Sequence, residues 1–378
     1  MAKRTVFHVM RTYGNHGGER QLAQMFAQPA PDIEEHFIFL YRDALCETLF
    51  AENTQLKFHR LWPFALPPRY QPWKELLCLL PLLPIMQLRL FALFIRHKPR
   101  ACIVHGFQAA LVAWPVAMVL GGRVGFAYFH RITKSRTGRN PLFRVIYAPY
   151  CKLVGVSKAV RDSLAGLAAA SRLMAIENGV DTQRILRAPP EAQRGGLRLI
   201  AVGRLLPHKG QHLLIEAFET CAGEFPVLEL WIVGDGEDFS NLEADIAKRN
   251  LGGRAKLLGR REDISQLLAQ ATVFCHASAW EGMSNAVLEA MAAGLPSVVA
   301  DAPGVSECHE NGVTGFVVAR DALSLAENIA TLLRDQSLRE RMGDAAAARA
   351  RGEYSIQANR RKFLALYDEL AGGSPCAA

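Results

Sequence analysis

Two glutamates stand in a segment of small and apolar residues near position 280 of this 378-residue chain. Glu281 and Glu289 are eight residues apart, which corresponds to about two helical turns. We expect Glu281 to lie at a strand-to-helix turn. Ionised carboxylates accept hydrogen bonds, so the two glutamates suit the hydroxyl groups of a sugar and a ribose. The alternative, that they are merely solvated charges on a helix, fits the apolar surroundings less well.

The four residues after Glu281 are the predicted start of a helix. The first backbone N–H groups of a helix have no partner within it, and they lie at the positive end of its dipole. The residues concerned are Gly282, Met283, Ser284 and Asn285. We expect free amides here, which would suit phosphate or sugar oxygens.

A second group of residues is suited to an anion. Arg204 follows Gly203 at the end of an apolar run, and Lys209 precedes Gly210 where the next helix is expected. Two cations beside a helix N-terminus make an anion-binding site. The sequence contains no D-x-D motif. We therefore expect a bound diphosphate to be neutralised by side-chain cations and backbone amides, with no metal and no cofactor.

Several common site types are absent from the sequence. The loop after the first expected strand lacks G-x-G-x-x-G, and no P-loop occurs, which disfavours an NAD-dependent oxidoreductase or a P-loop NTPase. The eight cysteines form no C-x-x-C pair and no Cys/His cluster with zinc spacing. The apolar run at 6–10 is too short for a signal-peptide core. We expect a cytoplasmic protein in a reducing compartment.

Strands and helices alternate through the second half of the chain. The strands are short, continuous apolar runs, as expected when both faces of a parallel sheet are covered. The expected strands are 197–203, 228–234, 255–258, 272–276, 296–300 and 315–318, and the expected helices are 211–221, 242–249, 264–269 and 285–293, followed by a long helix rich in Ala and Arg. This order predicts a Rossmann-like domain that binds ligands at the carboxyl ends of its strands.

The first half repeats the pattern less regularly. Strands are expected at 5–10, 36–41, 101–105, 123–130 and 152–156, and helices at 18–27, 86–97 and 109–120. The segment 187–196 is rich in Pro and Gly and is the expected linker. We therefore predict an N-terminal domain over 1–186 and a C-terminal domain over 197–357. Residues 358–378 are expected to form a terminal helix and a frayed tail.

Charge is distributed unevenly along the chain, whose net charge is +8. Residues 1–190 contain 25 Lys and Arg against 11 Asp and Glu, whereas residues 191–378 contain 19 against 25. A basic half favours an anionic partner such as a membrane surface, a phosphorylated lipid or nucleic acid. The longest apolar stretch, 76–94, is interrupted by prolines and polar residues, and we expect it to fall short of a membrane span. It is either a core helix or a basic, apolar segment at a bilayer interface.

The segment from Ala279 to Pro296 resembles the E-x7-E signature of GT-B glycosyltransferases of family 4, the glycosyl transferases group 1. Further segments of the second half resemble other parts of that family. They are Val202–Gly210, Ile232–Gly236, Leu258–Arg260, Gly312–Val317 and Glu177–Asp181. The first half matches less, at Gly17-Gly18-Glu19 and at Phe129-His130.

The resemblance implies an α/β protein of the GT-B fold, with two Rossmann-like domains whose parallel sheets face each other across a cleft. It implies closure of these domains over the donor, with the C-terminal helix returning to the N-terminal domain. It also implies a retaining, metal-independent transfer of a sugar from a nucleotide-diphosphate sugar to a saccharide or lipid-linked acceptor, in the assembly of cell-envelope polysaccharide or lipopolysaccharide.

The resemblance also assigns a role to each matched position. Arg204 and Lys209 would hold the diphosphate, Glu289 the ribose, and Glu281 the transferred sugar, while His130 would face the sugar or the acceptor. Further donor contacts are implied for Gly17, Gly18, Gly203, Gly234, Gly259, Arg260, Gly282, Met283, Ser284 and Asn285. The catalytic set would be His130, Glu281, Arg204 and Lys209.

Three other functions remain as alternatives. The basic half is compatible with a non-catalytic binder of an anionic polymer, but no nucleic-acid motif supports that partner. A GT-B sugar-nucleotide epimerase is opposed by the E-x7-E segment, and a phosphorylase by the lack of a motif for a lysine-bound cofactor. Peripheral contact with an anionic membrane at the inner face of the plasma membrane is a further hypothesis.

Overall fold

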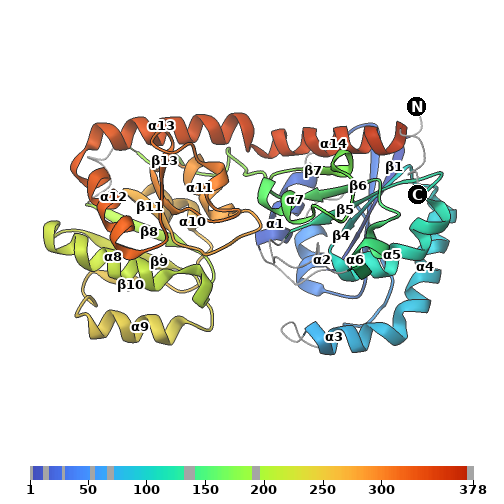
Figure 1. Ribbon diagram of the computed structural model, residues 1–378, viewed down its shortest axis with the longest axis horizontal. Coiled ribbons are helices and arrows are strands. Elements are labelled where there is room, and N and C mark those ends of the chain that lie inside the picture. The colour runs from blue at the N-terminus through green and yellow to red at the C-terminus, as the bar shows by residue number, and fades with distance from the viewer. Residues whose placement is uncertain are drawn as a thin grey trace. The chain divides into compact units, whose positions relative to one another are not determined.

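The computed structural model describes residues 3–11, 17–27, 30–51, 56–65, 72–131, 141–189 and 196–372. The chain forms two compact units, of which the first is Met1–Glu177 with Asn359–Ala378 and the second is Asn178–Ala358. Each unit contains one parallel β-sheet covered by helices (Figure 1). The two units are described separately below.

The first unit has a seven-stranded sheet in the order β3-β2-β1-β4-β5-β6-β7. The strands are β1 (Arg4–Met10), β2 (Ile33–Phe39), β3 (Lys57–Arg60), β4 (Ala101–His105), β5 (Gly125–His130), β6 (Lys152–Gly155) and β7 (Leu173–Ala175). The helices are α1 (Gly17–Phe26), α2 (Ala44–Ala51), α3 (Pro72–Leu79), η1 (Leu80–Leu82), α4 (Leu83–His97), α5 (Phe107–Leu120), α6 (Pro141–Tyr147), α7 (Lys158–Ser163) and η3 (Ala170–Arg172). Its core consists of apolar side chains from the central strands and from α4 and α5, such as Phe7, Val104 and Phe126.

The second unit has a six-stranded sheet in the order β10-β9-β8-β11-β12-β13. The strands are β8 (Arg198–Val202), β9 (Glu229–Val233), β10 (Ala255–Leu257), β11 (Val273–His276), β12 (Ser297–Ala300) and β13 (Gly315–Val318). The helices are η5 (Pro207–Lys209), α8 (Gln211–Glu224), α9 (Phe239–Lys248), α10 (Ile264–Ala269), α11 (Asn285–Ala292), η6 (Ser306–Cys308), α12 (Ala322–Arg334) and α13 (Gln336–Glu353). All pairings in both sheets are parallel, which confirms the predicted α/β class.

The long helix rich in Ala and Arg that was expected after β13 is α13, and a separate helix, α12, precedes it. α12 ends at Arg334 and α13 begins at Gln336, with Asp335 between them. The Asp335 carboxylate accepts a hydrogen bond from the Leu338 amide at 2.9 Å and so caps the second helix. The prediction missed the break between α12 and α13, because no glycine or proline marks it in the sequence.

The boundary between the units lies before Asn178 and not at the predicted residue 186. Val180 donates its amide hydrogen to Tyr354 O at 2.8 Å and accepts one from Ile356 at 2.9 Å. Ala188 donates to Ala293 O at 2.8 Å. These backbone bonds hold residues 178–188 to the second unit. Residues 190–195 of the predicted linker lie outside the described residues.

The last helix, α14 (Ile356–Gly372), lies mostly in the first unit. Its Phe363 ring stacks on Phe129 with centroids 5.4 Å apart. Its Tyr367 hydroxyl donates to Glu35 Oε1 at 2.8 Å, and the Arg360 guanidinium binds both oxygens of the same carboxylate at 2.7 and 2.9 Å. These contacts form a buried polar cluster that fastens α14 to β2.

The apolar stretch 76–94 differs from its prediction. The helical run Leu77–His97 is long and apolar enough to cross a membrane, by length and composition only. Pro81 and Pro84 do not interrupt it, because each occupies the first turn of a helical segment, where proline is tolerated. The expectation that it falls short of a membrane span was therefore wrong.

Candidate active site

Three glycine-bearing loops lie side by side at the carboxyl ends of β8, β9 and β10. Gly203 donates its amide hydrogen to Val233 O at 2.9 Å, and Gly234 donates to Gly259 O at 2.9 Å. Gly234 has φ +146°, and a Cβ there would collide with Gly203 O. The two loops can approach this closely only because Gly234 carries no side chain. The structure thus brings together three of the predicted donor-binding glycines.

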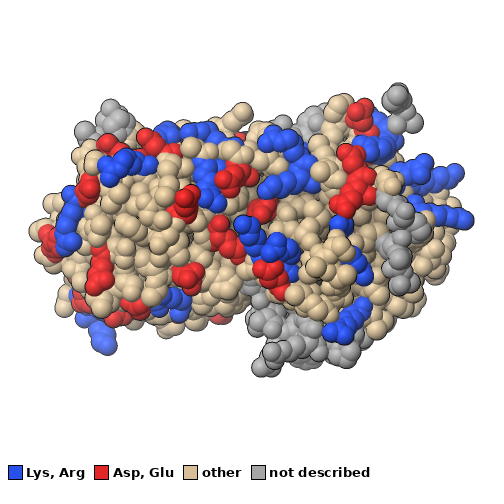
Figure 2. All heavy atoms as spheres, turned by 45° about the horizontal axis from the view of Figure 1, so that its top comes forward, with Lys and Arg blue, Asp and Glu red and all other residues tan. Residues whose placement is uncertain are grey.

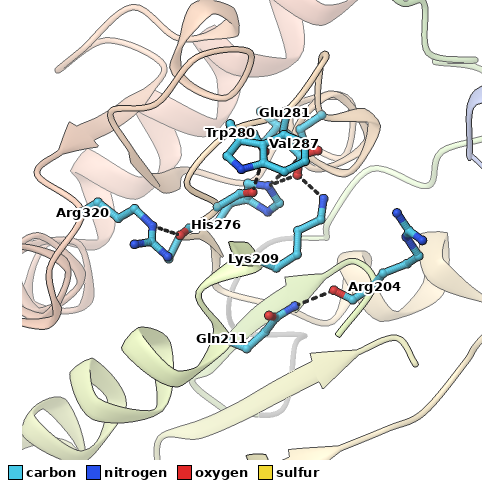
Figure 3. Close-up of polar contacts among 11 residues, drawn as sticks. Arg204, Lys209, Gln211, His276, Trp280, Glu281, Val287 and Arg320 are labelled. Atoms are coloured by element: carbon cyan, nitrogen blue, oxygen red, sulfur yellow. Dashed lines mark hydrogen bonds and ion pairs between the residues drawn. The ribbon is translucent and has the colours of Figure 1, made fainter. Parts of the chain in front are cut away.

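Lys209 is directed toward Glu281 by the tight turn between η5 and α8. Gly210 caps α8 with φ +73°, and a Cβ on this residue would collide with Ala277 O in the loop after β11. Lys209 Nζ forms an ion pair with Glu281 Oε1, and the two side chains are 13% and 14% exposed. Figure 3 shows Lys209 extending from the end of its turn to the Glu281 carboxylate. The predicted phosphate ligand and the predicted sugar ligand are therefore paired with each other.

The Glu281 carboxylate has a second partner, His276, at the end of β11. His276 Nε2 lies 3.2 Å from Glu281 Oε1, and Ser284 Oγ lies 3.4 Å from the same nitrogen. Burial alone would raise the pKa of Glu281, but the His276 hydrogen bond and the Lys209 charge outweigh it and lower the pKa to about 2. Glu281 is therefore an ionised hydrogen-bond acceptor at neutral pH.

The loop after β11 is held by backbone hydrogen bonds to the loop after β12. Glu281 donates its amide hydrogen to Pro303 O at 2.9 Å, and Ser284 donates to Gly304 O at 3.1 Å. The expectation of a free Ser284 amide was wrong, because the neighbouring loop uses it. Ser284 instead caps α11, since its hydroxyl accepts from the Val287 amide at 3.5 Å.

The first turn of α11 contacts Asn178 at the beginning of the second unit. Asn178 Nδ2 donates to Asn285 Oδ1 at 2.8 Å, and the Asn178 amide donates to the Met283 sulfur at 3.0 Å. Met283 and Asn178 are buried. These contacts make Met283 and Asn285 anchors for the loop, with Gly282 partly exposed before them.

Glu289 lies in the second turn of α11, which begins only at Asn285. Glu281 precedes the helix, which confirms the predicted strand-to-helix turn, but the eight residues to Glu289 do not form two turns of one helix. The loop conformation, and not helical periodicity, determines how the two carboxylates are placed. Glu289 is partly exposed.

Two predicted arginines are exposed near the glycine loops. Arg204 follows Gly203, and its guanidinium has no ion-pair partner among the residues that the structure describes. Gln211 Nε2 donates to Arg204 O at 3.0 Å and fixes the backbone of the loop (Figure 3). Arg260 follows Gly259 and is also exposed.

The structure adds three residues that the sequence analysis did not select. His276 contacts Glu281, and the His208 ring stacks on the Trp280 ring with centroids 4.3 Å apart and an interplanar angle of 6°. The signal for His276 was a polar residue at the end of the apolar run of β11, five residues before Glu281. The His208–Trp280 stack had no such signal.

Three candidate residues belong to the first unit. His130 ends β5, and its Nδ1 lies 2.9 Å from the Tyr128 hydroxyl. The Tyr147 hydroxyl donates to Tyr128 at 3.1 Å, so two buried tyrosines fix the orientation of the imidazole. Gly17 and Gly18 form the first residues of α1.

Known proteins resemble the second unit in sequence. Residues 183–349 match the family model described as Glycosyl transferases group 1. The second unit is a glycosyl transferases group 1 domain. The matched range contains the Arg204–Lys209 segment, the three glycine loops and the Glu281–Glu289 segment.

Curated relatives align with this chain over part of their length. The lipopolysaccharide core biosynthesis glycosyltransferase LpsE of Rhizobium meliloti is 29% identical over 240 residues, which are 61% of this chain and 68% of LpsE. A GDP-mannose:cellobiosyl-diphosphopolyprenol alpha-mannosyltransferase of Xanthomonas oryzae is 31% identical over 189 residues, about half of each chain.

Solved structures resemble the whole chain in fold. The Anabaena HepE structure in complex with UDP has a TM-score of 0.80, with 21% sequence identity over 97% of this chain and 100% of HepE. The lipopolysaccharide outer core galactosyltransferase WaaB in its apo form has a TM-score of 0.76 and 16% identity over 97% of this chain and 100% of WaaB. The chain has the GT-B fold, which confirms the predicted architecture of two Rossmann-like units.

Proposed function

We propose that this chain is a retaining, metal-independent glycosyltransferase that uses a nucleotide-diphosphate sugar as its donor. The observation that carries the proposal is the group of Lys209, Glu281 and His276 at the strand ends of a group 1 domain, with Arg204 exposed nearby. Cations and an ionised carboxylate at one sheet edge suit a ligand that joins a diphosphate to a polyhydroxylated sugar.

Arg204 and Lys209 would bind the donor diphosphate. Negative charge grows on the leaving phosphate as the glycosidic bond breaks, and preorganised cations stabilise that charge in the transition state. Lys209 would exchange its ion pair with Glu281 for one with the phosphate. Gly203, Gly234 and Gly259 would let the donor approach the backbone, with Arg260 at the margin of the same edge.

The two glutamates would bind hydroxyl groups. Glu281, ionised and held by His276, would accept hydrogen bonds from the transferred sugar, and Glu289 would bind the ribose. Met283 and Asn285 would shape the loop, and the amide of Gly282 would contact the sugar or the phosphate. In the first unit, His130 remains a predicted contact of the sugar or the acceptor. Gly17 and Gly18 remain predicted contacts of the diphosphate.

The diphosphate leaves from one face of the sugar. If it directs the acceptor hydroxyl to that same face, the anomeric configuration is retained. In that case the phosphate oxygen takes the hydroxyl proton, the acceptor oxygen forms the new bond to the anomeric carbon, and the diphosphate leaves with the bonding electrons. A metal ion is not required if two side-chain cations neutralise the charge of the diphosphate. The names of the relatives favour a saccharide or lipid-linked glycan as acceptor, in lipopolysaccharide or cell-envelope polysaccharide assembly.

The central test combines donor selection with product analysis. Thermal shifts with UDP, GDP, ADP and CMP sugars would select a donor, and release of its free nucleotide would then be measured with and without saccharide acceptors. We expect acceptor-dependent nucleotide release that persists in EDTA, and a product whose anomeric proton coupling matches that of the donor. An epimerised donor without nucleotide release would overturn transferase activity. Loss of activity in EDTA would overturn metal independence, and an inverted product would overturn retention.

We further propose that α3, η1 and α4 contact an anionic membrane at the inner face of the plasma membrane. α4 buries Met86, Leu90 and Phe94 in the core of its unit. Another set of large apolar side chains in the same run is exposed at 42–72%, namely Leu77, Leu80, Ile85, Leu88 and Ile95. Water-exposed apolar side chains next to Arg96 and Lys98 suit the boundary between acyl chains and anionic headgroups.

Flotation with vesicles tests this contact. We expect the chain to float with phosphatidylglycerol vesicles at low salt and to float less with phosphatidylcholine. Leu88→Glu and Ile95→Glu should abolish flotation, whereas Val227→Glu, which alters an exposed apolar residue of the second unit, should not. Flotation of the Leu88 and Ile95 variants at the level of the Val227 variant would contradict the assignment. In Figure 2, Lys and Arg side chains project from the first unit at the right of the view.

A further inference from the structure

Three histidines from different elements of the first unit lie together beside its edge strand. His36 is on β2, His59 is on β3, and His97 is the last residue of α4. β2 and β3 are parallel, and His59 pairs with Ile38, two residues after His36. Because side chains alternate along a strand, His36 and His59 leave the sheet on the same face. The His97 ring lies on that face too, with its centroid 4.7 Å from that of His36 and 5.2 Å from that of His59.

The nitrogen atoms of this histidine cluster have the separations of a metal site. One ring nitrogen from each of the three residues lies within 4.8 Å of the others, and His36 Nδ1 is 3.0 Å from His59 Nε2. Tetrahedral Zn²⁺ with Zn–N bonds of about 2.0–2.1 Å places its ligand nitrogens about 3.3 Å apart. His36 and His59 are already near that separation, and a small rotation of the partly exposed His97 side chain would complete the set.

We propose that His36, His59 and His97 bind a divalent transition metal ion, with Zn²⁺ as the ion that best matches three imidazole ligands. Imidazole nitrogen is a borderline-soft ligand that suits Zn²⁺ and its first-row neighbours better than Mg²⁺ or Ca²⁺. Three protein ligands leave the fourth tetrahedral position for water.

A carboxylate is placed to support the buried ligand. His36 Nε2 has no hydrogen-bond partner among the described residues, although Glu34 Oε2 lies 3.3 Å away. Glu34 also forms an ion pair with Lys57. If His36 binds the ion through Nδ1, its Nε2–H faces the Glu34 carboxylate, which is the usual second partner of a metal-bound histidine. The ion would thus fix the tautomer in which His36 Nε2 carries the proton and can donate it to Glu34.

The surroundings also keep the ligands in their metal-binding form. Burial is the largest cause that lowers the pKa of His36, His97 and His59, the last to about 4. A lower pKa favours the neutral imidazole, which is the form that binds a metal ion. Arg96 and Lys57 oppose a cation, while the carboxylate of Glu34 and the C-terminal end of α4 favour one.

The position of the histidine cluster indicates a structural role. His97 ends α4 shortly before β4 begins, at the amino-terminal end of that strand. His130 lies at the carboxyl end of β5, away from this end of the sheet. A metal at the cluster would fasten edge strand β3 and α4 to the sheet, and it is independent of the proposed transfer reaction.

Metal content and thermal stability test the inference without an activity assay. The full-length, untagged chain would be loaded with Zn²⁺, dialysed, and analysed for metal, with Co²⁺ loading to record the absorption bands of a tetrahedral site. We expect one Zn²⁺ per chain and a higher melting temperature with Zn²⁺ than in EDTA, because an ion that binds only the folded state stabilises it. Mg²⁺ should produce no such shift.

Variants locate the metal. His97→Gln and His59→Gln should each lose the bound ion and the zinc-dependent shift, while Glu34→Gln should weaken binding about 10–100-fold. His97 is the safer change because it lies at a helix end and is only partly buried. His212→Gln, at an exposed position of α8, is the matched control and should keep one Zn²⁺. Absence of stoichiometric metal in the natural chain, or its retention in both folded histidine variants, would overturn the proposal.

Discussion

Lys209 and Glu281 form an ion pair across two loops at the strand ends of the second unit, 72 residues apart in sequence. Both side chains are mostly buried, so each compensates the charge of the other in the absence of a ligand. A bound diphosphate offers Lys209 a stronger partner and leaves the Glu281 carboxylate to the sugar. The pair is thus a resting arrangement of two groups that we assign to adjacent parts of one donor.

A double-mutant cycle measures this pairing. Lys209→Met and Glu281→Gln should each lower kcat/KM for the donor by about 10²–10³-fold, because each removes a group that stabilises the transition state. In urea unfolding, the effects of the two substitutions on the free energy of unfolding should depart from additivity by about 1–3 kcal/mol, because the two side chains are in contact. Arg334 and Glu224, an exposed ion pair of the same unit, provide the control and should show a coupling below about 1 kcal/mol. Equal coupling energies for the two pairs would contradict the assignment.

The lowered pKa of Glu281 predicts a dependence of stability on pH. The folded-state pKa is about 2, below the ordinary value of 4.5. Between pH 2 and pH 4.5 the unfolded chain binds more protons than the folded chain. The contribution of Glu281 to the free energy of unfolding is therefore complete above about pH 4.5 and is lost as the pH falls toward 2. By pH 3.5 the loss should be about 1 kcal/mol. Urea unfolding of the natural chain and of Glu281→Gln at pH 6 and 3.5 would measure it. A stability difference between the two proteins that is the same at both pH values would contradict the pKa assignment.

Arg204→Ala and Glu289→Ala test the outer parts of the donor site. Arg204 is exposed and Glu289 partly exposed, so neither change should lower the melting temperature by more than about 2 °C. Each should reduce donor use by about 10²-fold or more, because a charge that contacts the diphosphate or the ribose is lost. Initial rates and melting curves on the same samples would check both statements. Full activity in both variants would show that the donor lies elsewhere.

The second unit was predictable because its strands are short apolar runs that end in glycine. Observed β13 and α10 have the predicted bounds, and β8 differs by one residue at each end. The candidate residues followed from the same signal, since ligands bind at the carboxyl ends of parallel strands. The ion pair of Lys209 with Glu281 was not predictable. It depends on how two loops fold over each other, which no periodicity encodes.

Other features lacked a local signal altogether. β3 reads Lys-Phe-His-Arg, with too few apolar residues to indicate a strand, and it forms only because β2 offers an edge to pair with. Its His59 joins His36 and His97 from two other elements. A search for metal sites by short sequence spacing misses such a cluster, because the ligands are adjacent only in the folded sheet.

Gly210 should be intolerant of any side chain. It has φ +73°, and a Cβ there would collide with Ala277 O. Gly210→Ala should therefore lower the free energy of unfolding by about 2 kcal/mol or more and weaken donor use, because it displaces Lys209. Gly223, in the last turn of α8, has nothing within 4 Å of an added Cβ. Gly223→Ala should be neutral or stabilising by up to about 1 kcal/mol. Urea unfolding of the two variants compares them directly, and similar losses in both would contradict the argument.

The buried cluster of Glu35, Arg360 and Tyr367 should determine how firmly α14 is held in the first unit. The Glu35 and Arg360 side chains are each 6% exposed and form two hydrogen bonds, and the Tyr367 hydroxyl adds a third to the same carboxylate. Glu35→Gln leaves a buried guanidinium without its counter-charge, so unfolding should become easier by about 3–5 kcal/mol.

Asp368→Asn is the matched control. Asp368 of α14 forms an ion pair with Arg4 of β1, so it joins the same helix to the same sheet, but at an exposed position. It should cost less than about 1 kcal/mol. Hydrogen exchange should localise the effect, with faster exchange of α14 amides in Glu35→Gln than in Asp368→Asn. If the amides of α14 exchange equally slowly in both variants, the buried cluster does not hold the helix, and the apolar contacts of Phe363 must do so instead.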